Sequence, residues 1–372
     1  MNRRRFLSVA GGVVLAAGGA GYLLSDRKNI VRADIASDLS DKPLPKPDER
    51  EILYFSSLAP SGHNTQPWWV KYIEPYHWVI CNDKTKWLPA VDPTQRETIL
   101  SIGAFTQNLE YAAGNAGYNC QFRTLAQSNQ DVEVVEVTLG KAGSAAAFDI
   151  NRIKNRRTVR SNYLSDTLKK EDADHLMSAE QEFFYFIPNS AKEYAYLNEQ
   201  TIEANRIQAY RDAAQSELAD WVRFSSKDAA ARRDGLTTAT MEIEGLPGWF
   251  VRNFYNKTSV MQNSFRDQTI DKVKTQVTQS AGWLLVTSPD NSTATLLETG
   301  RRMQRLFLKV REKGIAVHPM TQALEEPSIK DSVYQSLALG DEIQFVLRLG
   351  YLKEYPAPVS LRRPVDRFVV SV

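Results

Sequence analysis

One short stretch of this sequence, residues 58–69, combines residue types that suit ligand binding and do not suit the interior of a helix or a central strand. It reads LAPSGHNTQPWW, with several side chains that can form hydrogen bonds. Pro60 and Pro67 each lack a backbone N–H donor and have a fixed φ, while Gly62 allows backbone conformations closed to other residues. The stretch is therefore predicted to be a shaped loop that leads into a strand near Trp68 and binds a ligand.

Regular elements are predicted on both sides of this loop. The first part of the chain is expected to form helices at 48–58 and 94–115 and strands at 68–73, 78–82, 119–125 and 132–139. In the longer helix, side chains that suit burial recur in alternating steps of four and three, which places them on one face. These residues are Thr98, Ile102, Phe105, Leu109, Ala112 and Ala116.

The later part of the chain is predicted to contain a further set of helices and strands. Strands are expected at 183–187, 283–287, 315–317 and 343–350, and helical regions at 192–224 and 292–313. Residues 225–279 fit no simple pattern, although they contain an aromatic cluster at 245–255. The mixture of helices and strands predicts the α+β class.

An internal comparison predicts that one fold is present twice. Residues 98–117 align with residues 295–314 at a constant offset of 197, and each helix is followed by a predicted strand. The identical pairs are Thr98/Thr295, Leu100/Leu297, Gly103/Gly300, Gln107/Gln304, Leu109/Leu306 and Gly117/Gly314. Because a generic amphipathic helix does not need glycine, the shared glycines favour a true repeat. The predicted units are 48–150 and 151–372, the second enlarged by a helical insertion at about 192–279.

Two motifs, in this order, resemble those of the FMN-dependent nitroreductases. Residues 60–68 resemble the family's P-S-x-x-N-x-Q-P-W loop, and Arg156-x-Thr158-x-Arg160 resembles its R-x-S-x-R/K segment. The whole chain resembles the exported, tandem Acg-type branch, in which two nitroreductase-like halves form a pseudo-dimer in one chain. The resemblance implies a nitroreductase-like fold, FMN as cofactor and a monomer that imitates a dimer.

The resemblance assigns a role to each motif. FMN requires cations for its phosphate and a polar clamp beside an apolar surface for its ring. Phosphate contacts are expected from Arg156, Thr158 and Arg160 and from the late basic pair Arg362 and Arg363. Ring contacts are expected from the loop residues Pro60, Ser61, Gly62, Asn64 and Gln66, and the backbone N–H groups near Met320 and Thr321 are expected close to flavin N5.

The distribution of the motifs predicts one composite FMN site per chain. The loop occurs only in the first half and the Arg156–Arg160 segment only in the second. A symmetric dimer of the family would have two such sites. No side chain is assigned a catalytic role, because the flavin supplies the chemistry. His63 is given none, and His318 is either a structural histidine at a strand end or a proton donor.

The N-terminus resembles a twin-arginine (Tat) export signal, with Arg3 and Arg4 ahead of an uncharged run at 6–24. This run approaches the length of about 20 residues that crosses a bilayer, so it could be cleaved or remain as an anchor. Residues 25–47 are expected to be a tether. We therefore expect the Tat machinery as a partner and a periplasmic or membrane-anchored location facing outside.

Bulk composition excludes some alternatives. The 46 basic and 44 acidic residues give a net charge of +2, so no electrostatic argument favours nucleic acid. Cys81 and Cys120 have no metal-ligand partners nearby in sequence, so no metal site is expected. Both are predicted to be buried free thiols, with a disulfide between them as the alternative.

Two functions remain open from the sequence. The first is an oxidoreductase that takes hydride from reduced nicotinamide through flavin N5 and delivers it to a small nitroaromatic, quinone or similar acceptor. The alternative is a protein that holds or sequesters FMN, with residues 245–255 as a lid over the flavin. A vestigial site on an interaction module is a third interpretation, less favoured because every phosphate and ring position is filled.

Overall fold

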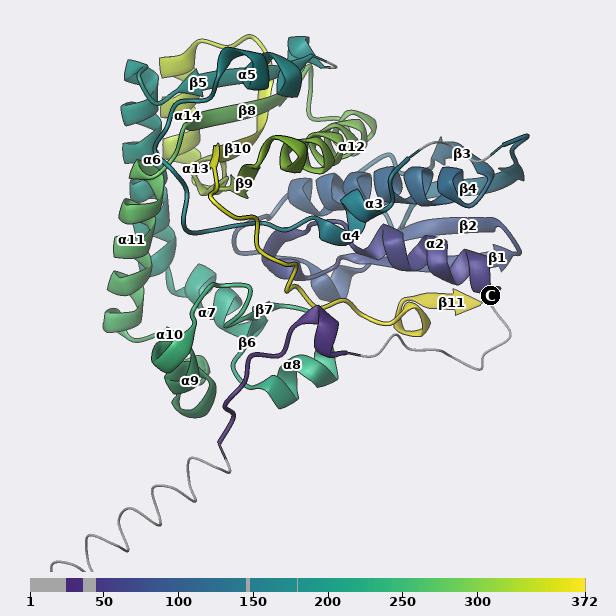
Figure 1. The fold of residues 1–372 in the computed structure, drawn as a ribbon, viewed down its shortest axis with the longest axis horizontal. Coiled ribbons are helices and arrows are strands. Elements are labelled where there is room, and N and C mark those ends of the chain that lie inside the picture. Colours follow the sequence, from purple (N-terminus) through teal and green to yellow (C-terminus); the bar gives the residue numbers. More distant parts are fainter. Residues whose placement is uncertain (1–24, 36–44, 145–147, 179, 372) are drawn as a thin grey trace, which may run out of the picture.

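Two β-sheets with the same strand order organise the molecule (Figure 1). The computed structural model describes residues 25–35, 45–144, 148–178 and 180–371, and every structural statement concerns these residues. The first sheet contains β1 (Trp68–Glu74), β2 (His77–Asn82), β3 (Tyr118–Thr124) and β4 (Glu133–Lys141). The second contains β5 (Phe184–Pro188), β8 (Gly282–Ser288), β9 (Ile315–Pro319) and β10 (Glu342–Tyr351).

The order β1-β2-β4-β3 in the first sheet matches β5-β8-β10-β9 in the second. Neighbouring strands within each set of four are antiparallel. In both halves a long helix joins the second strand to the third: α3 (Arg96–Asn115) in the first and α12 (Thr293–Lys309) in the second. This duplicated topology confirms the α+β class and the prediction of two tandem halves.

The two aligned helices α3 and α12 cross each other at the aligned glycines. A Cβ built on Gly103 would lie 2.1 Å from the carbonyl oxygen of Leu297, and one built on Gly300 would lie 2.0 Å from that of Leu100. Leu100 and Leu297 are themselves an aligned pair, so the contacts are reciprocal. The offset of 197 thus corresponds to a pseudo-twofold axis through the helix crossing, and the two backbones can approach this closely only because both positions lack a Cβ.

The two halves share one hydrophobic core around this crossing. It includes Phe105 from α3, Phe307 from α12 and Trp68 from β1, all at most 1% exposed. A second core lies on the other face of the second sheet, against the helices of the insertion. All seven residues of β8 are therefore buried, whereas in β3 buried or half-buried positions alternate with exposed ones as far as Arg123. A sheet that is covered on both faces needs apolar residues throughout, and one covered on a single face needs them at every second position.

The C-terminal strand β11 (Val369–Ser371) crosses back to the first half and pairs in parallel with β1. The Val70 N–H donates to the Phe368 carbonyl oxygen at 2.6 Å. Phe368 is fully buried, with its ring 6.5 Å from that of Phe105. The last residues of the chain therefore complete the sheet of the first half.

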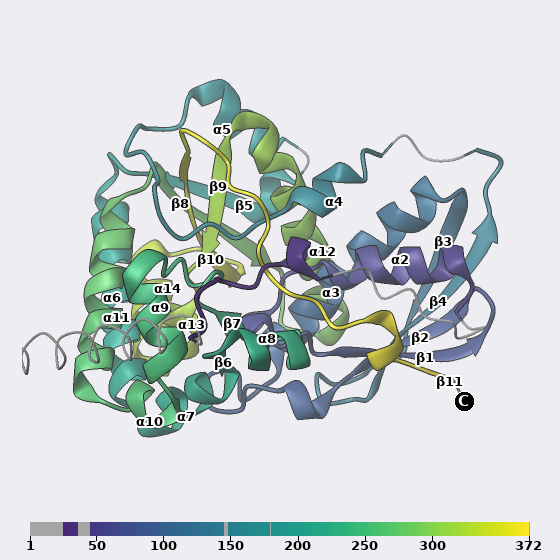
Figure 2. The same ribbon diagram turned by 60° about the horizontal axis from the view of Figure 1, so that its bottom comes forward.

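The remaining helices pack around the two sheets and form the insertion (Figure 2). Outside the insertion lie α2 (Pro47–Ser57), α4 (Asn151–Asn155), α5 (Lys170–Met177), α13 (Gln322–Glu325) and α14 (Pro327–Leu337). The insertion contains α6 (Lys192–Tyr210), α7 (Asp212–Trp221), α8 (Ser226–Arg232), α9 (Gly245–Phe254), α10 (Lys257–Val260) and α11 (Asn263–Thr278), with a short parallel pair β6 (Val222–Arg223) and β7 (Leu236–Thr237).

Several local expectations change with the structure. The patternless stretch 225–279 is largely helical, and α11 escaped detection because most of its residues are polar. Cys81 and Cys120 are free thiols, so the disulfide alternative is wrong. Cys81 is buried as predicted, whereas Cys120 is only half-buried. Of the expected tether at 25–47, residues 25–35 and 45–47 are described. Residues 25–29 contact α9, Arg32 donates to the Lys154 carbonyl oxygen, and α2 already begins at Pro47. Among the described helices, none combines the length and the apolar character needed to span a bilayer, and the run at 6–24 lies outside the described residues.

Candidate functional site

A cavity of about 600 Å³ opens between the two halves, and residues of the predicted loop line it. The first half contributes residues 60–63, and the second contributes Thr158, Arg160 and residues 318–321. Side chains of α6, α7 and α11 close it. The structure therefore brings together seven of the twelve predicted site residues, namely Pro60, Ser61, Gly62, Thr158, Arg160, Met320 and Thr321.

The loop has an unusual backbone. His63, Asn64 and Gln66 have φ values of 45°, 55° and 55°, in the left-handed region that non-glycine residues rarely adopt. Gly62 lies outside that region, which corrects the expectation about its role. A Cβ there would lie 3.1 Å from Leu88 Cδ1, so this glycine provides space instead of a special φ. Three strained residues in one loop persist only where the surroundings hold them, and such strain is typical of ligand sites.

The side chains of Asn64 and Gln66 help to stabilise this loop backbone, and they do not line the cavity. The Asn64 amide donates to the carbonyl oxygens of Gly235 (3.1 Å) and Leu361 (3.3 Å). The Gln66 amide donates to the Arg233 carbonyl oxygen at 2.9 Å. Both side chains are buried. Their amides therefore fix the loop from behind, and the structure does not bring them to the cavity.

Arg156 and Arg362, predicted to bind phosphate, donate instead to the C-terminal end of α2. Arg362 donates to the carbonyl oxygens of Ser57 (2.6 Å), Leu58 (3.3 Å) and Ala59 (3.0 Å), and Arg156 donates to that of Leu58 (2.9 Å). The last carbonyls of a helix lack intrahelical partners and carry partial negative charge, which attracts cations. Burial, together with nearby guanidinium groups, lowers the pKa of Arg362 well below its usual value.

Arg363 has a similar structural role on the other side of the loop. Its guanidinium donates to the carbonyl oxygens of Gln66 (2.6 Å) and Trp68 (2.5 Å), and its backbone N–H donates to Gln66 Oε1 at 2.9 Å. The three arginines thus position the loop of the first half by contacts from the second. They lie outside the cavity lining, which differs from the predicted arrangement at a phosphate.

The cations that do line the cavity are Arg160 and Lys272. Arg160 donates to the Thr240 carbonyl oxygen at 2.8 Å, and Lys272 donates to that of Met241 at 2.7 Å. Neither bond neutralises charge. Burial, followed by the Arg160 charge, lowers the pKa of Lys272. Glu242 accepts from the Arg160 backbone N–H at 3.0 Å and pairs with Arg157, and its charge acts on both cations. Two neighbouring, half-buried cations whose side chains donate to carbonyl oxygens suit an anionic ligand.

Two histidines lie near these cations. Burial and then the Arg160 charge lower the pKa of His63 to about 4. His318 is 8% exposed, and burial, followed by the charges of Arg348, Arg160 and Lys272, lowers its pKa well below the usual value. Within the described residues, neither Nδ1 atom has a hydrogen-bond partner. Both rings are therefore neutral at pH 7 and retain unused hydrogen-bonding capacity.

The predicted backbone donors near flavin N5 are only partly available. The Met320 N–H already donates to the Val346 carbonyl oxygen at 2.9 Å, as an extension of the strand pairing. In the part of the chain that the structure describes, the Thr321 N–H has no such partner. Of these two backbone N–H groups, that of Thr321 is therefore the one available to a ligand. Met320 contributes its apolar side chain to the cavity.

A carboxyl pair, one member from each half, forms another part of the wall. Glu97 begins α3 and Glu325 ends α13, and both line the cavity. Gln208 donates to Glu325 Oε2 at 2.7 Å. Burial and then the Glu97 charge raise the pKa of Glu325 well above its usual value. Two neighbouring carboxylates in a poorly solvated site do not both ionise readily, so this wall favours the protonated form of Glu325.

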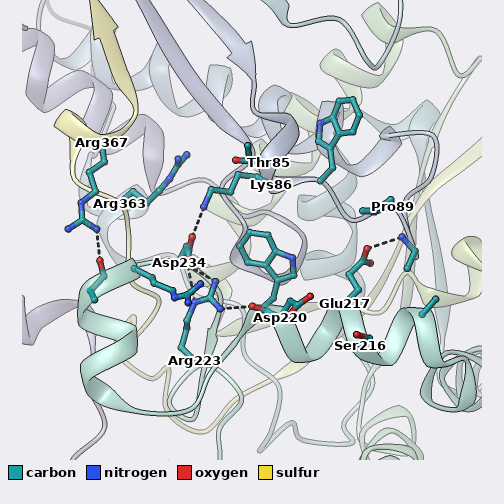
Figure 3. A pocket seen from close by; sticks show the side chains of 16 residues that line it. Thr85, Lys86, Pro89, Ser216, Glu217, Asp220, Arg223, Asp234, Arg363 and Arg367 are labelled. Carbon is teal, nitrogen blue, oxygen red and sulfur yellow. Dashed lines mark hydrogen bonds and ion pairs between the residues drawn. The ribbon is translucent and has the colours of Figure 1, made fainter. Parts of the chain in front are cut away.

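An open groove of about 900 Å³ lies on the other side of α7 (Figure 3). Its central charges neutralise one another: Asp234 accepts from Lys86 at 2.8 Å and from Arg223 at 2.7 Å. Glu217 accepts from the Ala90 N–H at 2.8 Å. These contacts hold the segment after β2 against α7 and thereby support the neighbouring cavity wall.

The aromatic segment 245–255 does not cover the cavity, which corrects its predicted role as a lid. None of its residues lines the cavity, and Leu246, Phe250 and Phe254 are exposed. Covering side chains come instead from its flanks, at Met241, Ile243 and Phe265. The aromatic residues of this segment, which has no counterpart in the first half, suggested a cover for a flat ring, but sequence alone does not specify which way those side chains point.

Comparisons with known proteins support the resemblance. No protein-family model matches the chain. Among curated proteins, acg of Mycobacterium tuberculosis, named as a candidate NAD(P)H nitroreductase, is 23% identical over 338 residues, which cover 85% of this chain and 93% of acg. PigM of a Serratia species, also named as an NAD(P)H nitroreductase, is 20% identical over 330 residues, with coverage of 84% and 90%. These matches over most of both chains confirm that the chain is related to the nitroreductase superfamily.

Two solved structures are also similar. The FMN-dependent nitroreductase NfnB of Mycobacterium smegmatis in complex with NADPH has a TM-score of 0.35 and 15% identity, and the match covers 55% of this chain and 91% of NfnB. A nitroreductase with bound FMN from Desulfitobacterium hafniense has a TM-score of 0.35 and 12% identity, with coverage of 60% and 97%.

Sequence reasoning missed three charged residues of the cavity wall, namely Glu97, Lys272 and Glu325. Glu97 occupies the first turn of a predicted helix, where an acidic residue is ordinary. Lys272 lies in the stretch that fitted no pattern. Only their position around one cavity distinguishes these residues from surface charges, and no local signal reports that position.

Proposed function

We propose that the chain is an FMN-dependent oxidoreductase of the nitroreductase type, with one FMN in the composite cavity. The observation that carries the proposal is that the loop of one half and the Thr158–Arg160 segment of the other line the same cavity. Its volume of about 600 Å³ lies within the usual range of about 300–1,000 Å³ for cofactor sites. The names of the curated relatives support the same class.

The residues present fit this cofactor. Arg160 and Lys272 offer charge to a phosphate, and the Thr158 hydroxyl offers a further hydrogen bond. The backbone of residues 60–63 and the side chains of Met303, Met320 and Phe345 offer a polar edge and an apolar surface for a flat ring. The unpartnered Nδ1 atom of the buried His318 is a polar group that a ligand can satisfy.

FMN, when bound, supplies two-electron transfer between a reduced nicotinamide and a nitroaromatic, quinone or similar acceptor. The protein's own groups orient and protonate. The Thr321 N–H is placed to donate a hydrogen bond toward the ring edge, where negative charge accumulates on reduction. The protonated form of Glu325, which burial favours, would hold a proton inside the cavity, and side chains of α6, α7 and α11 would screen part of the bound ring from solvent.

The experiment is flavin release from the purified full-length chain, measured per polypeptide. We expect a ratio near one, and a ratio near two would refute a single composite site. Arg160→Ala and Lys272→Ala should lower the occupancy. Lys274→Ala is the matched control, because Lys274 lies on the same helix but is exposed and paired with Asp271. Wild-type occupancy in both cavity variants would contradict the assignment.

Storage of FMN is the competing function, and one observation favours it. Three insertion helices contribute a large share of the cavity wall, which restricts the space beside a bound flavin. Stopped-flow mixing with reduced nicotinamide separates the two functions. Rapid bleaching of the flavin supports the oxidoreductase, whereas a flavin that is not bleached supports storage.

Export by the Tat pathway, with a periplasmic or membrane-anchored location, is also our proposal. It is supported by Arg3 and Arg4 ahead of the uncharged run at 6–24. Replacement of both arginines by lysine preserves the charge and should leave the protein in the cytoplasmic fraction. Unchanged export of that variant would refute the Tat route.

A further inference from the structure

Helix α9 carries a continuous apolar stripe on the protein surface. Leu246, Phe250 and Phe254 are 78%, 50% and 57% exposed. Their spacing of four residues places them on one face of the helix. The rings of Phe250 and Phe254 lie 4.9 Å apart. Single exposed apolar side chains are ordinary, but a contiguous stripe of large ones on a ten-residue helix indicates a surface that meets another apolar phase.

The inward side of α9 binds the first described residues of the chain. The Trp249 indole N–H donates to Ser25 Oγ at 2.9 Å. Asp26 and Asn253 exchange two hydrogen bonds, of 2.9 Å and 3.1 Å, and Arg252 donates to the Arg27 carbonyl oxygen at 3.0 Å. The segment that follows the N-terminal run is therefore fixed along α9.

The sequence indicates where the chain continues from this point. The uncharged run at 6–24 ends one residue before Ser25, and its 19 residues approach the length of about 20 that crosses a bilayer. If that run enters a membrane, its end lies beside α9. Exposed basic residues lie nearby, at Arg27, Lys28 and Lys257. Lys28 pairs with Asp34 and Lys257 with Asp220, but exposed ion pairs of this kind are weak in water. Such exposed cations suit the neighbourhood of anionic lipid headgroups.

We propose that α9 is an interfacial helix whose stripe of Leu246, Phe250 and Phe254 lies in the headgroup region of a lipid bilayer, beside the point where the N-terminal run enters the membrane. The inference rests on the proposed membrane anchoring and is independent of the flavin chemistry. It accounts for the exposed aromatic segment that the cavity does not use. It also fixes the orientation of the folded part, with α9 toward the lipid and the β3–β4 edge at the far end of the molecule (Figure 1).

The test uses the full-length chain in vesicles of phosphatidylcholine and phosphatidylglycerol that contain nitroxide-labelled lipid. An environment-sensitive fluorophore is attached in separate proteins to Leu246→Cys and to Val132→Cys. Val132 is 51% exposed and lies in the first half, in the segment that precedes β4 and outside α9, so it is the matched control. Because both positions are exposed, neither label should disturb folding.

We expect the label at position 246 to shift to the blue and to be quenched severalfold more strongly by nitroxide lipid than the label at 132. If the protein floats with the vesicles but both labels remain aqueous, anchoring stands and the role of α9 is overturned. If the protein does not float, both are overturned. A blue shift at 246 without lipid quenching places another protein surface on the stripe, either the chain's own run at 6–24 or a second copy, and also overturns the proposal.

Discussion

The crossing of α3 and α12 can be tested by Gly103→Ala. The new Cβ would lie 2.1 Å from the Leu297 carbonyl oxygen, whereas ordinary contact begins at 3.4 Å. The shortfall of about 1.3 Å must be met by moving one helix backbone away from the other, which places the cost near the upper end of overpacking, about 3 kcal/mol. The higher helix propensity of alanine offsets about 1 kcal/mol. We therefore expect a net loss of about 2 kcal/mol, roughly 30-fold in the ratio of folded to unfolded protein.

The pseudo-symmetry of the crossing extends this prediction to Gly300→Ala. The two alanines would push apart the same pair of helices, so the double variant should lose less stability than the sum of the single variants. Because the cavity walls come from both halves, each single variant should also hold less flavin. Independent effects of the two alanines would contradict the reciprocal contact.

Urea unfolding followed by far-ultraviolet circular dichroism measures these changes without depending on bound flavin. Gly140→Ala is the control, because a Cβ at this position of β4 meets no atom within 4 Å. It should change stability by no more than about 0.5 kcal/mol. If Gly103→Ala unfolds at the same urea concentration as Gly140→Ala, the inference of a close-packed pseudo-twofold crossing is refuted.

Three further outcomes follow from the site. Arg362→Lys should lower the free energy of unfolding by about 2 kcal/mol and lower flavin occupancy, because two or more charged hydrogen bonds to the loop are lost although no residue of the cavity lining changes. Scanning fluorimetry measures the stability and flavin absorbance the occupancy, and undiminished occupancy would contradict the prediction. Burial, followed by the Glu97 charge, raises the pKa of Asp92 to about 6, whereas the value in the unfolded chain is about 4. The contribution of Asp92 to the free energy of unfolding therefore falls as the pH rises from about 4 to 6. Glu97→Gln should lessen that fall when stability is measured by urea titration at several pH values, and an unchanged pH profile would exclude the coupling. Burial raises the thiol pKa of both Cys81 and Cys120 to about 12, so iodoacetamide at pH 8 should modify neither before unfolding and both afterwards.

The fold was predictable where its signals are periodic or repeated. The helix face that begins at Thr98 and the offset between Gly103 and Gly300 both record packing in the sequence, because a buried face requires apolar spacing and a close helix crossing requires glycine. Helix α11 was not predictable, since its polar residues face solvent and the cavity. Its burial depends on tertiary contacts that no local pattern reports.

The site was predictable in its location but less so in its contacts. The loop at 60–66 and the segment at 156–160 do meet, as the two motifs indicated. The binding partner of each arginine could not be predicted from its position in a motif. A guanidinium can donate to the free carbonyl groups at a helix C-terminus as readily as it donates to a phosphate. Arg160 lines the cavity and Arg156 caps α2, although they are only four residues apart and belong to the same motif.

The return of β11 to β1 has a consequence for biosynthesis. The sheet edge formed by residues 68–74 is completed by residues 369–371, so a nascent first half cannot finish its own sheet. At about 5–20 residues per second, roughly 15–60 s separate the synthesis of the two strands. During that interval β1 presents unpaired backbone groups, and the site that Phe368 will fill is open. The first sheet therefore acquires its final packing only after residues 369–371 have left the ribosome, which makes this short strand a determinant of folding yield.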